Sequence, residues 1–412
     1  MWKIVLLVAA VGAGAVSAQQ VADAVAPEAA GAGAFEGLPA DYAGAMAAKI
    51  QGKPVVAQNW MVAAANPHAV KAGADALAAG GTAADALVAV QVMLGLVEPQ
   101  SSGLGGGAFL VWYDAATGTV TTLDGRETAP LAATPRRFQD ADGEPLRFFD
   151  AVVGGRSVGV PGTPALLDVV HDRWGALEFA DLTAPAIAMA EAGFAVSPRL
   201  AGLIEGDQER LGKFAATAAY FMPEGVPLAA GQILRNPAYA DTLRMLSGDA
   251  ASFYLGANAQ EMVSAVNDAM DGAGLLSTVD LSIYRVKERA AVCAPYRGHD
   301  VCGMGPPSSG AVAVGQILGL LEGHDLSAGP QDAGVRRLMG DAARLAFADR
   351  GRYLADSDYV PVPVTGLLDP AYLAERAKLL NGDVALDDIA PGNPAFDHAL
   401  LWADDMSIEL PS

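Results

Sequence analysis

The sequence predicts an α+β fold, in which helices pack around a smaller antiparallel sheet. Strand-forming residues flank a turn at 114–118, so residues 109–113 and 119–123 are expected to form a hairpin. A second turn at 294–298 predicts another hairpin within 290–304, and residues 55–65 supply a further strand candidate. The stretch from about 185 to 270 has an almost wholly helical pattern. Strands and helices are thus segregated and do not alternate as in βαβ units, which indicates α+β layers.

Several helix boundaries carry capping signals. Asn66 stands before Pro67, a suitable first helical residue, and the glycine pair at 80–81 should end that helix. Thr82 stands three residues before Asp85, which is the spacing of a capping box at the start of the next helix. The same reasoning predicts helices that begin at Thr163 and after Ser309, and apolar residues at helical spacing predict one more from Val335.

Composition limits the possible classes of protein. The chain has 412 residues, of which 52% are hydrophobic, so it can bury a large core. Its 26 Lys and Arg against 47 Asp and Glu give a net charge of −21, which excludes the clustered basic surface that nucleic acid requires. Five histidines without an HExxH or CxxC pattern predict no metal site, and no cofactor is implied.

The N-terminus has the pattern of an export signal over residues 1–18. Lys3 precedes a short apolar run at 4–16, and small residues at 16–18 suit cleavage. The run is short for a membrane span, although an uncleaved anchor stays an alternative, and no later stretch is expected to enter a membrane. Residues 19–42 form an Ala/Gly-rich leader, and 43–412 are expected to form one compact unit. The predicted location is the periplasm or the extracellular space.

The two cysteines, Cys293 and Cys302, flank the turn at 294–298. In an oxidising compartment a disulfide across the hairpin is expected, and two reduced buried thiols are the alternative.

Two motifs have structural explanations. The pattern GxSxG at 155–159 matches the nucleophile elbow of α/β-hydrolases, but the following Val-Pro-Gly cannot open the helix that the elbow requires, so the match is interpreted as coincidental. The run SSGLGGG at 101–107 lacks the Gly-Lys ending of a phosphate-binding loop. Its glycines therefore serve either backbone conformation and close approach or a simple flexible turn.

Arg126 follows the second predicted strand beside a glycine. An Arg in this position can present its fork to a carboxylate, but a surface ion pair, with Glu127 as the neighbouring candidate, is the ordinary explanation.

Eight segments in order resemble the γ-glutamyltransferase (γ-glutamyl transpeptidase, glutathione hydrolase) family over most of the chain. These segments are GGTAADA (80–86), EPQSSGLGGG (98–107), DGRETAP (124–130), VPG (160–162), FYLG (253–256), DLSIY (280–284), PPSSG (306–310) and AFADR (346–350). Each is weak alone, but their shared order is specific.

The resemblance implies an N-terminal-nucleophile hydrolase with an αββα sandwich, of which this chain is the large-subunit part. Such precursors cut themselves, and the catalytic Thr then begins a separate small subunit. Here that Thr is expected immediately after Ser412, so Ser412 is the predicted processing site and no catalytic residue lies in this chain. Arg126 is implied to bind the substrate α-carboxylate, in place of the ion pair.

The sequence is compatible with three functions. The first is a secreted γ-glutamyltransferase or glutathione hydrolase that acts on γ-glutamyl peptides, with water or an amino-acid or peptide acceptor, and is inactive without its small subunit. The second is a related acylase for glutaryl or β-lactam substrates or for poly-γ-glutamate. The third is a truncated, non-catalytic binding protein.

Overall fold

The computed structural model describes residues 40–269 and 272–396, and the chain divides into two compact units. Of these described residues, unit 1 contains those up to Gly107 together with Arg126–Arg285, and unit 2 contains Ala108–Gly125 and those from Val286 to 396. The predicted signal at 1–18 and Ser412 lie outside the described residues. Whether the two units together form the single domain expected over 43–412 stays a prediction.

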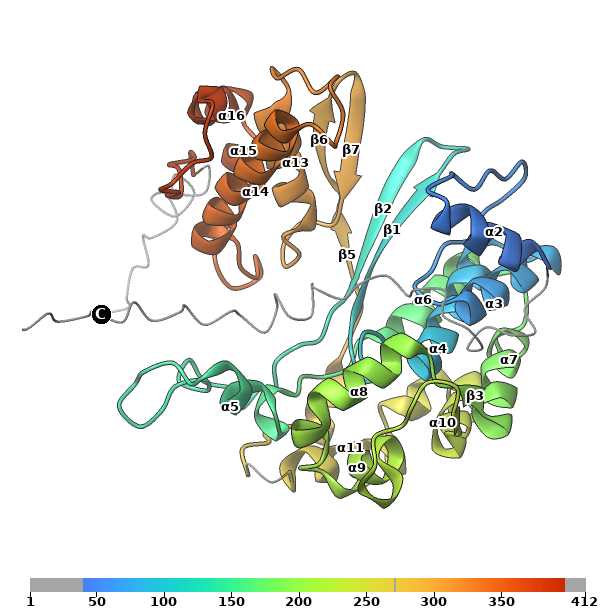
Figure 1. Ribbon diagram of the computed structural model, residues 1–412. Coiled ribbons are helices and arrows are strands. Elements are labelled where there is room, and N and C mark those ends of the chain that lie inside the picture. The colour runs from blue at the N-terminus through green and yellow to red at the C-terminus, as the bar shows by residue number, and fades with distance from the viewer. Residues whose placement is uncertain (1–39, 270–271, 397–412) are drawn as a thin grey trace, which may run out of the picture. The chain divides into compact units, whose positions relative to one another are not determined.

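Unit 1 is almost entirely helical (Figure 1). Its helices are α2 (Ala40–Ile50), α3 (Pro67–Ala78), α4 (Ala83–Val97), α5 (Phe148–Val152), α6 (Thr163–Trp174), α7 (Phe179–Ala192), α8 (Pro198–Leu211), α9 (Ala215–Phe221), α10 (Pro237–Gly248), α11 (Gly256–Asn267) and α12 (Thr278–Ile283). Short 3-10 turns are η1 (Gly155–Ser157), η2 (Pro223–Gly225) and η3 (Ala250–Phe253), and β3 (Phe194–Ala195) pairs with β4 (Ile233–Leu234). Within the described ranges, no helix has the length and apolar character to cross a membrane.

The capping signals correctly place the first long helices. The Asn66 side chain accepts a hydrogen bond from the His68 N–H at 3.0 Å at the start of α3. At the start of α4, Thr82 and Asp85 form both bonds of a capping box. Because α4 is apolar on nearly every side, it is buried against α3, α6 and α7 and forms the core of unit 1.

Unit 2 begins with the predicted hairpin. Strands β1 (Ala108–Asp114) and β2 (Thr119–Gly125) pair antiparallel, from Ala108 opposite Gly125 to Asp114 opposite Thr119. The Asp114 side chain accepts from the Ala116 N–H at 2.9 Å, and Gly118 has a φ of 69°, so this turn has the residues that it requires. Strand β5 (Lys287–Ala290) completes a three-stranded sheet beside β2.

The rest of unit 2 packs around α13 (Gly310–Leu321). This helix contacts α14 (Ala333–Tyr353), α16 (Pro370–Ala377) and the hairpin of β6 (Val292–Tyr296) and β7 (His299–Gly303), with α15 (Val364–Leu367) and η4 (Lys378–Asn381) nearby (Figure 1). The core cluster consists of buried aliphatic residues on these helices and η4: Leu320, Leu321, Ala342, Leu345, Leu373 and Leu380.

Two local predictions are corrected by the structure. Residues 55–65 form no strand in the described chain, because a strand needs a neighbour and no other described segment pairs with them. Ser309 is the N-cap residue of α13, but its side chain makes no capping bond. The Ser309 hydroxyl instead accepts a hydrogen bond from Arg350 Nε at 2.9 Å.

Candidate functional site

Arg126 is the first residue of unit 1 after the β1–β2 hairpin, and its side chain is exposed. The Arg126 carbonyl accepts a hydrogen bond from the Tyr284 hydroxyl at 2.8 Å. Because the backbone carbonyl makes this bond, the bond fixes the main chain at Arg126 independently of the guanidinium. The structure therefore shows how Arg126 is anchored, whereas its substrate role stays a prediction.

A pair of buried tyrosines connects the Arg126 backbone to the interior of unit 1. The rings of Tyr254 and Tyr284 are stacked, with centroids 5.8 Å apart and an angle of 1° between their planes. The Tyr254 hydroxyl donates to the Pro161 carbonyl at 2.9 Å and accepts from the Ala165 N–H at 3.1 Å. Burial raises the pKa of Tyr254 above its ordinary value of 10, so the hydroxyl stays protonated and can donate.

The glycine loop at 101–107 allows close backbone approach beside Arg126. A Cβ atom on Gly107 would lie 2.8 Å from the Arg126 Cα and 2.7 Å from the Glu127 backbone nitrogen. These distances are too short for any side chain, so only glycine fits here. The Gly106 carbonyl accepts from the Gly162 N–H at 2.8 Å and from the Thr163 N–H at 3.1 Å. A positive φ does not explain the glycines of this loop, because none of them has one. Of the two explanations, close approach holds at Gly107.

A third segment, at 159–160, packs against the residues that follow Arg126. The Val160 N–H donates to the Thr128 carbonyl at 2.8 Å, and the two residues form an isolated β-bridge. A Cβ atom on Gly159 would lie 2.9 Å from the Thr128 carbonyl oxygen. The Arg126 segment is thus bonded or closely packed on both sides, by the glycine loop and by the chain that leads into α6.

Glu98 connects the glycine loop beside Arg126 to the core of unit 1. This residue caps the C-terminal end of α4 and leads into the glycine loop. Its buried carboxylate accepts from Asn66 Nδ2 at 2.8 Å, Gln100 Nε2 at 2.6 Å and Arg199 Nη1 at 2.9 Å. The charge is therefore paired and hydrogen-bonded, as a buried carboxylate must be. The sequence places Glu98 in a family segment but does not reveal its partners.

Asp280 holds the chain that continues from the Arg126 segment. Its carboxylate accepts from the Leu131 N–H at 2.8 Å and from both the N–H and the hydroxyl of Ser277, in the capping box of α12. Burial alone would raise the pKa of Asp280, but these three hydrogen bonds together hold the pKa below its ordinary value of 3.8.

This arrangement predicts a pH-dependent stability. Because the folded-state pKa is lowered, the contribution of Asp280 is fully present above pH 3.8 and is lost as the pH falls through the folded-state pKa. Asp280→Asn is expected to lower the free energy of unfolding near neutral pH by about 1.5–3 kcal/mol. The difference from wild type, measured by urea denaturation of the complete protein, should shrink in acid. The exposed Asp142→Asn is the matched control, and an equal effect of both variants at every pH would contradict the prediction.

The GxSxG pattern is not a nucleophile elbow. Ser157 ends the short 3-10 turn η1, and its hydroxyl donates to the Val152 carbonyl at 2.8 Å. The next residue, Val158, is extended, and α6 begins only at Thr163, so no helix follows the serine directly. The explanation from sequence therefore agrees with the structure.

The remaining predicted positions lie elsewhere. Cys293 and Cys302 are joined by a disulfide between β6 and β7 in unit 2, where they face each other in the strand register. Ser412 falls outside the described residues. Within the described part of the chain, no group of three or more His, Cys, Asp or Glu side chains is arranged to hold a metal ion.

Comparison with known proteins identifies the class to which this fold and site belong. The family model described as gamma-glutamyltranspeptidase matches residues 69–398, so the chain belongs to the γ-glutamyltranspeptidase family. The match confirms the family to which the eight segments pointed, and the members of that family are enzymes.

Particular relatives refine this picture. The chain is similar to the glutathione hydrolase proenzyme of Bacillus subtilis strain 168, with 37% identity over 82% of this chain and 57% of that protein. It is also similar to the acylase ACY 1 proenzyme of Pseudomonas sp. strain V22, with 36% identity over 80% of this chain and 59% of that protein. This chain thus spans less than two thirds of the length of either curated relative.

A solved structure supports the fold class. The Helicobacter pylori γ-glutamyltranspeptidase crystal structure matches with a TM-score of 0.77 and 33% identity, over 82% of this chain and 97% of that chain. This likeness confirms the α+β class and the N-terminal-nucleophile hydrolase fold of the family.

Proposed function

We propose that this chain is the large subunit of a periplasmic or secreted γ-glutamyltransferase or glutathione hydrolase. The observation that carries the proposal is the Arg126 segment, anchored on both sides in a chain that belongs to this family. No cofactor is part of the proposal. The export pattern at 1–18 supports the location.

The shares of the related proteins that this chain covers support a separate small subunit. The chain matches only 57–59% of two related proenzymes but 97% of one chain in the Helicobacter pylori structure. A proenzyme cut into two chains would produce this difference. Unit 1 also has exposed apolar side chains in the irregular stretch 54–64, where Val55, Val56, Trp60 and Met61 are 46–83% exposed. A complementary chain that covered them would remove this apolar surface from water.

In the proposed mechanism, the guanidinium of Arg126 binds the substrate α-carboxylate through two parallel hydrogen bonds. The hydroxyl of a Thr that follows Ser412, at the start of the small subunit, attacks the γ-amide carbonyl carbon. Its own α-amine takes the hydroxyl proton and then gives it to the leaving nitrogen, so the amine departs neutral as the C–N bond breaks. Water or an acceptor amine then attacks the glutamyl ester and releases the Thr. Arg126 contributes by holding the substrate in place throughout.

The proposal is tested with protein made from the complete reading frame. Intact-mass analysis should find a partner chain beginning with Thr, and the protein should release the amine from a γ-glutamyl anilide. A lone chain derived from these 412 residues, with no activity, would support the truncated binding protein instead.

A related acylase is the second candidate, because the Pseudomonas acylase is nearly as similar as the glutathione hydrolase. Glutaryl substrates lack the α-amino group of γ-glutamyl substrates, so the ratio of kcat/KM for a matched pair separates the two activities. A preference for the glutaryl compound would favour the acylase.

Tyr284→Phe tests whether the tyrosine pair positions Arg126. The variant keeps the aromatic ring of the stack and removes the hydroxyl that donates to the Arg126 carbonyl, and losing that hydrogen bond costs about 0.5–1.5 kcal/mol. We expect KM for the γ-glutamyl anilide to rise up to about tenfold with kcat nearly unchanged, as for a loss of uniform binding. Tyr220→Phe, on α9, is the control. A fall in kcat without a change in KM would contradict the positioning role.

A further inference from the structure

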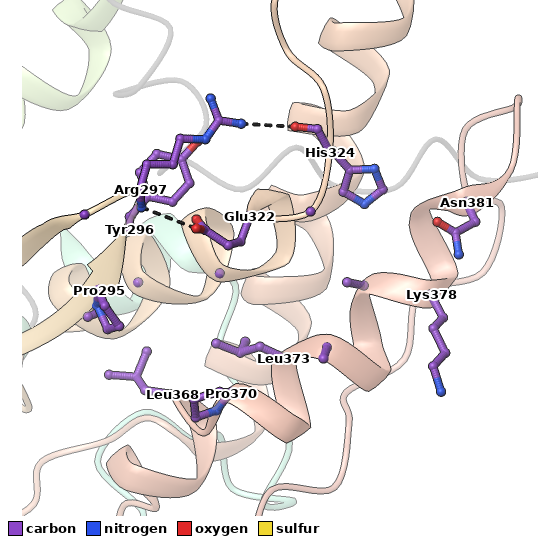
Figure 2. A pocket seen from close by; sticks show the side chains of 17 residues that line it. Pro295, Tyr296, Arg297, Glu322, His324, Leu368, Pro370, Leu373, Lys378 and Asn381 are labelled. Carbon is purple, nitrogen blue, oxygen red and sulfur yellow. Dashed lines mark hydrogen bonds between the residues drawn. The ribbon is translucent and has the colours of Figure 1, made fainter.

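Unit 2 contains an open pocket of about 600 Å³, a size typical of small-molecule sites. Its walls come from the β6–β7 turn, the C-terminal end of α13 with the residues that follow, and α16 with η4 (Figure 2). All of these elements belong to unit 2, so the pocket depends on no contact with unit 1.

One side of the pocket is apolar. Pro295, Leu368, Pro370 and Leu373 line this side, and Figure 2 shows them below Arg297 and Glu322. Leu373 packs directly against α13 because the helix has a glycine at 319, where a Cβ atom would lie 2.6 Å from Leu373 Cδ1. This side can accept an aliphatic or aromatic group and remove it from water.

The other side carries charges of both signs. Arg297, at the β6–β7 turn, uses one guanidinium N–H to bond the His324 carbonyl at 3.0 Å. The Glu322 carboxylate lies beside it and accepts a long 3.4 Å bond from the Arg297 backbone N–H. Lys378 also lines the pocket, although it is paired with Glu375. A carboxylate can thus be bound by Arg297, and an ammonium by Glu322.

The backbone at Arg297 gives an independent reason to look for a ligand. Arg297 and Gly298 have φ values of 47° and 81°, the combination found in a type I′ turn. The first position of such a turn favours Asn, Asp or Gly, because other side chains are strained there. Strained backbone positions of this kind cluster at ligand-binding sites, and Arg297 lines the pocket, so the strain adds to the case for a ligand there.

From this juxtaposition we infer that the pocket binds a zwitterionic amino acid or dipeptide with an apolar side chain. Arg297 binds the carboxylate, Glu322 binds the ammonium, and the apolar side chain lies against Leu368 and Leu373. The inference goes beyond the proposed function and does not depend on it, because the binding requires no γ-glutamyl donor.

The ligand chemistry is tested by calorimetric titration of the complete protein with L-phenylalanine. Removing the carboxylate (phenylalaninamide), the ammonium (3-phenylpropanoate) or the side chain (glycine) should each weaken binding at least tenfold, which is about 1.4 kcal/mol. Absence of phenylalanine binding, or equal binding of all four compounds, would overturn the inference. Since no donor is present, the result stands whether or not the protein hydrolyses γ-glutamyl amides.

Two variants locate the binding. Arg297→Asn keeps a residue that suits the turn, so the protein should be at least as stable as wild type while phenylalanine affinity falls at least tenfold. Ala374→Trp places a large side chain at an exposed lining position of α16 and should abolish binding. Ala371→Trp, exposed on the same helix but outside the lining, is the control and should bind normally. Unchanged affinity in both Arg297→Asn and Ala374→Trp would place any binding elsewhere and refute the inference.

Discussion

Replacing Arg126 with alanine is expected to lower kcat/KM for γ-glutamyl anilides by roughly thirty-fold to several thousand-fold. The range follows from the cost of truncating one partner of a hydrogen-bonded charge pair, about 2–5 kcal/mol. Arg126→Lys should recover only part of the loss, because an ammonium keeps the charge but cannot reproduce the two parallel bonds of the guanidinium. Steady-state kinetics of the complete protein measure both variants.

The structure separates this effect from a loss of folding. Arg126 is exposed, and its carbonyl bond to Tyr284 survives the substitution, so the free energy of unfolding should change by no more than about 0.5 kcal/mol. Arg147, which is 89% exposed and forms an ion pair with Asp150, provides a matched arginine in the same unit. Arg147→Ala should retain full activity. Unchanged catalytic efficiency in Arg126→Ala would remove Arg126 from the site.

Glu98→Ala is expected to give the largest loss of stability, about 3–5 kcal/mol. The substitution removes the partner of Arg199, whose side chain is 17% exposed, and leaves the amides of Asn66 and Gln100 without their acceptor. Because Glu98 also leads into the glycine loop beside Arg126, activity should fall even at temperatures where the variant remains folded. Urea denaturation and kinetics on the same preparation measure both effects.

The control for Glu98 is Glu191, which forms an ion pair with Arg244 at the surface of unit 1. Its side chain is 49% exposed, so Glu191→Ala should cost no more than about 1 kcal/mol. If the two variants lost equal stability, the buried hydrogen bonds of Glu98 would contribute no more than a surface ion pair.

Local signals in the sequence predicted the helix boundaries well. The capping residues Asn66, Thr82 and Asp85 act on backbone groups within three residues, so their spacing alone is sufficient. Ser309 shows the limit of this reasoning. It occupies the cap position, but its hydroxyl bonds Arg350, 41 residues away, and no local pattern reveals such a partner.

Interactions between distant segments were the part that sequence could not supply. Tyr254 and Tyr284 both lie in segments that resemble the family, yet their stacking and the bond to the Arg126 carbonyl join residues up to 158 positions apart. The strand predicted at 55–65 failed for a related reason. Its residues have strand composition, but strand formation depends on a partner that the described chain does not provide.

The tight meeting of Gly107 with Arg126 has a practical consequence. Gly107 and Arg126 flank the hairpin formed by residues 108–125, and they approach each other closely at its base. From this base the two strands are paired without a break, from Ala108 opposite Gly125 to Asp114 opposite Thr119. Changes at the exposed tip, residues 115–118, are therefore separated from Arg126 by seven paired positions. An epitope or fluorophore inserted at that tip should report on the protein while leaving the geometry at the base of the hairpin intact.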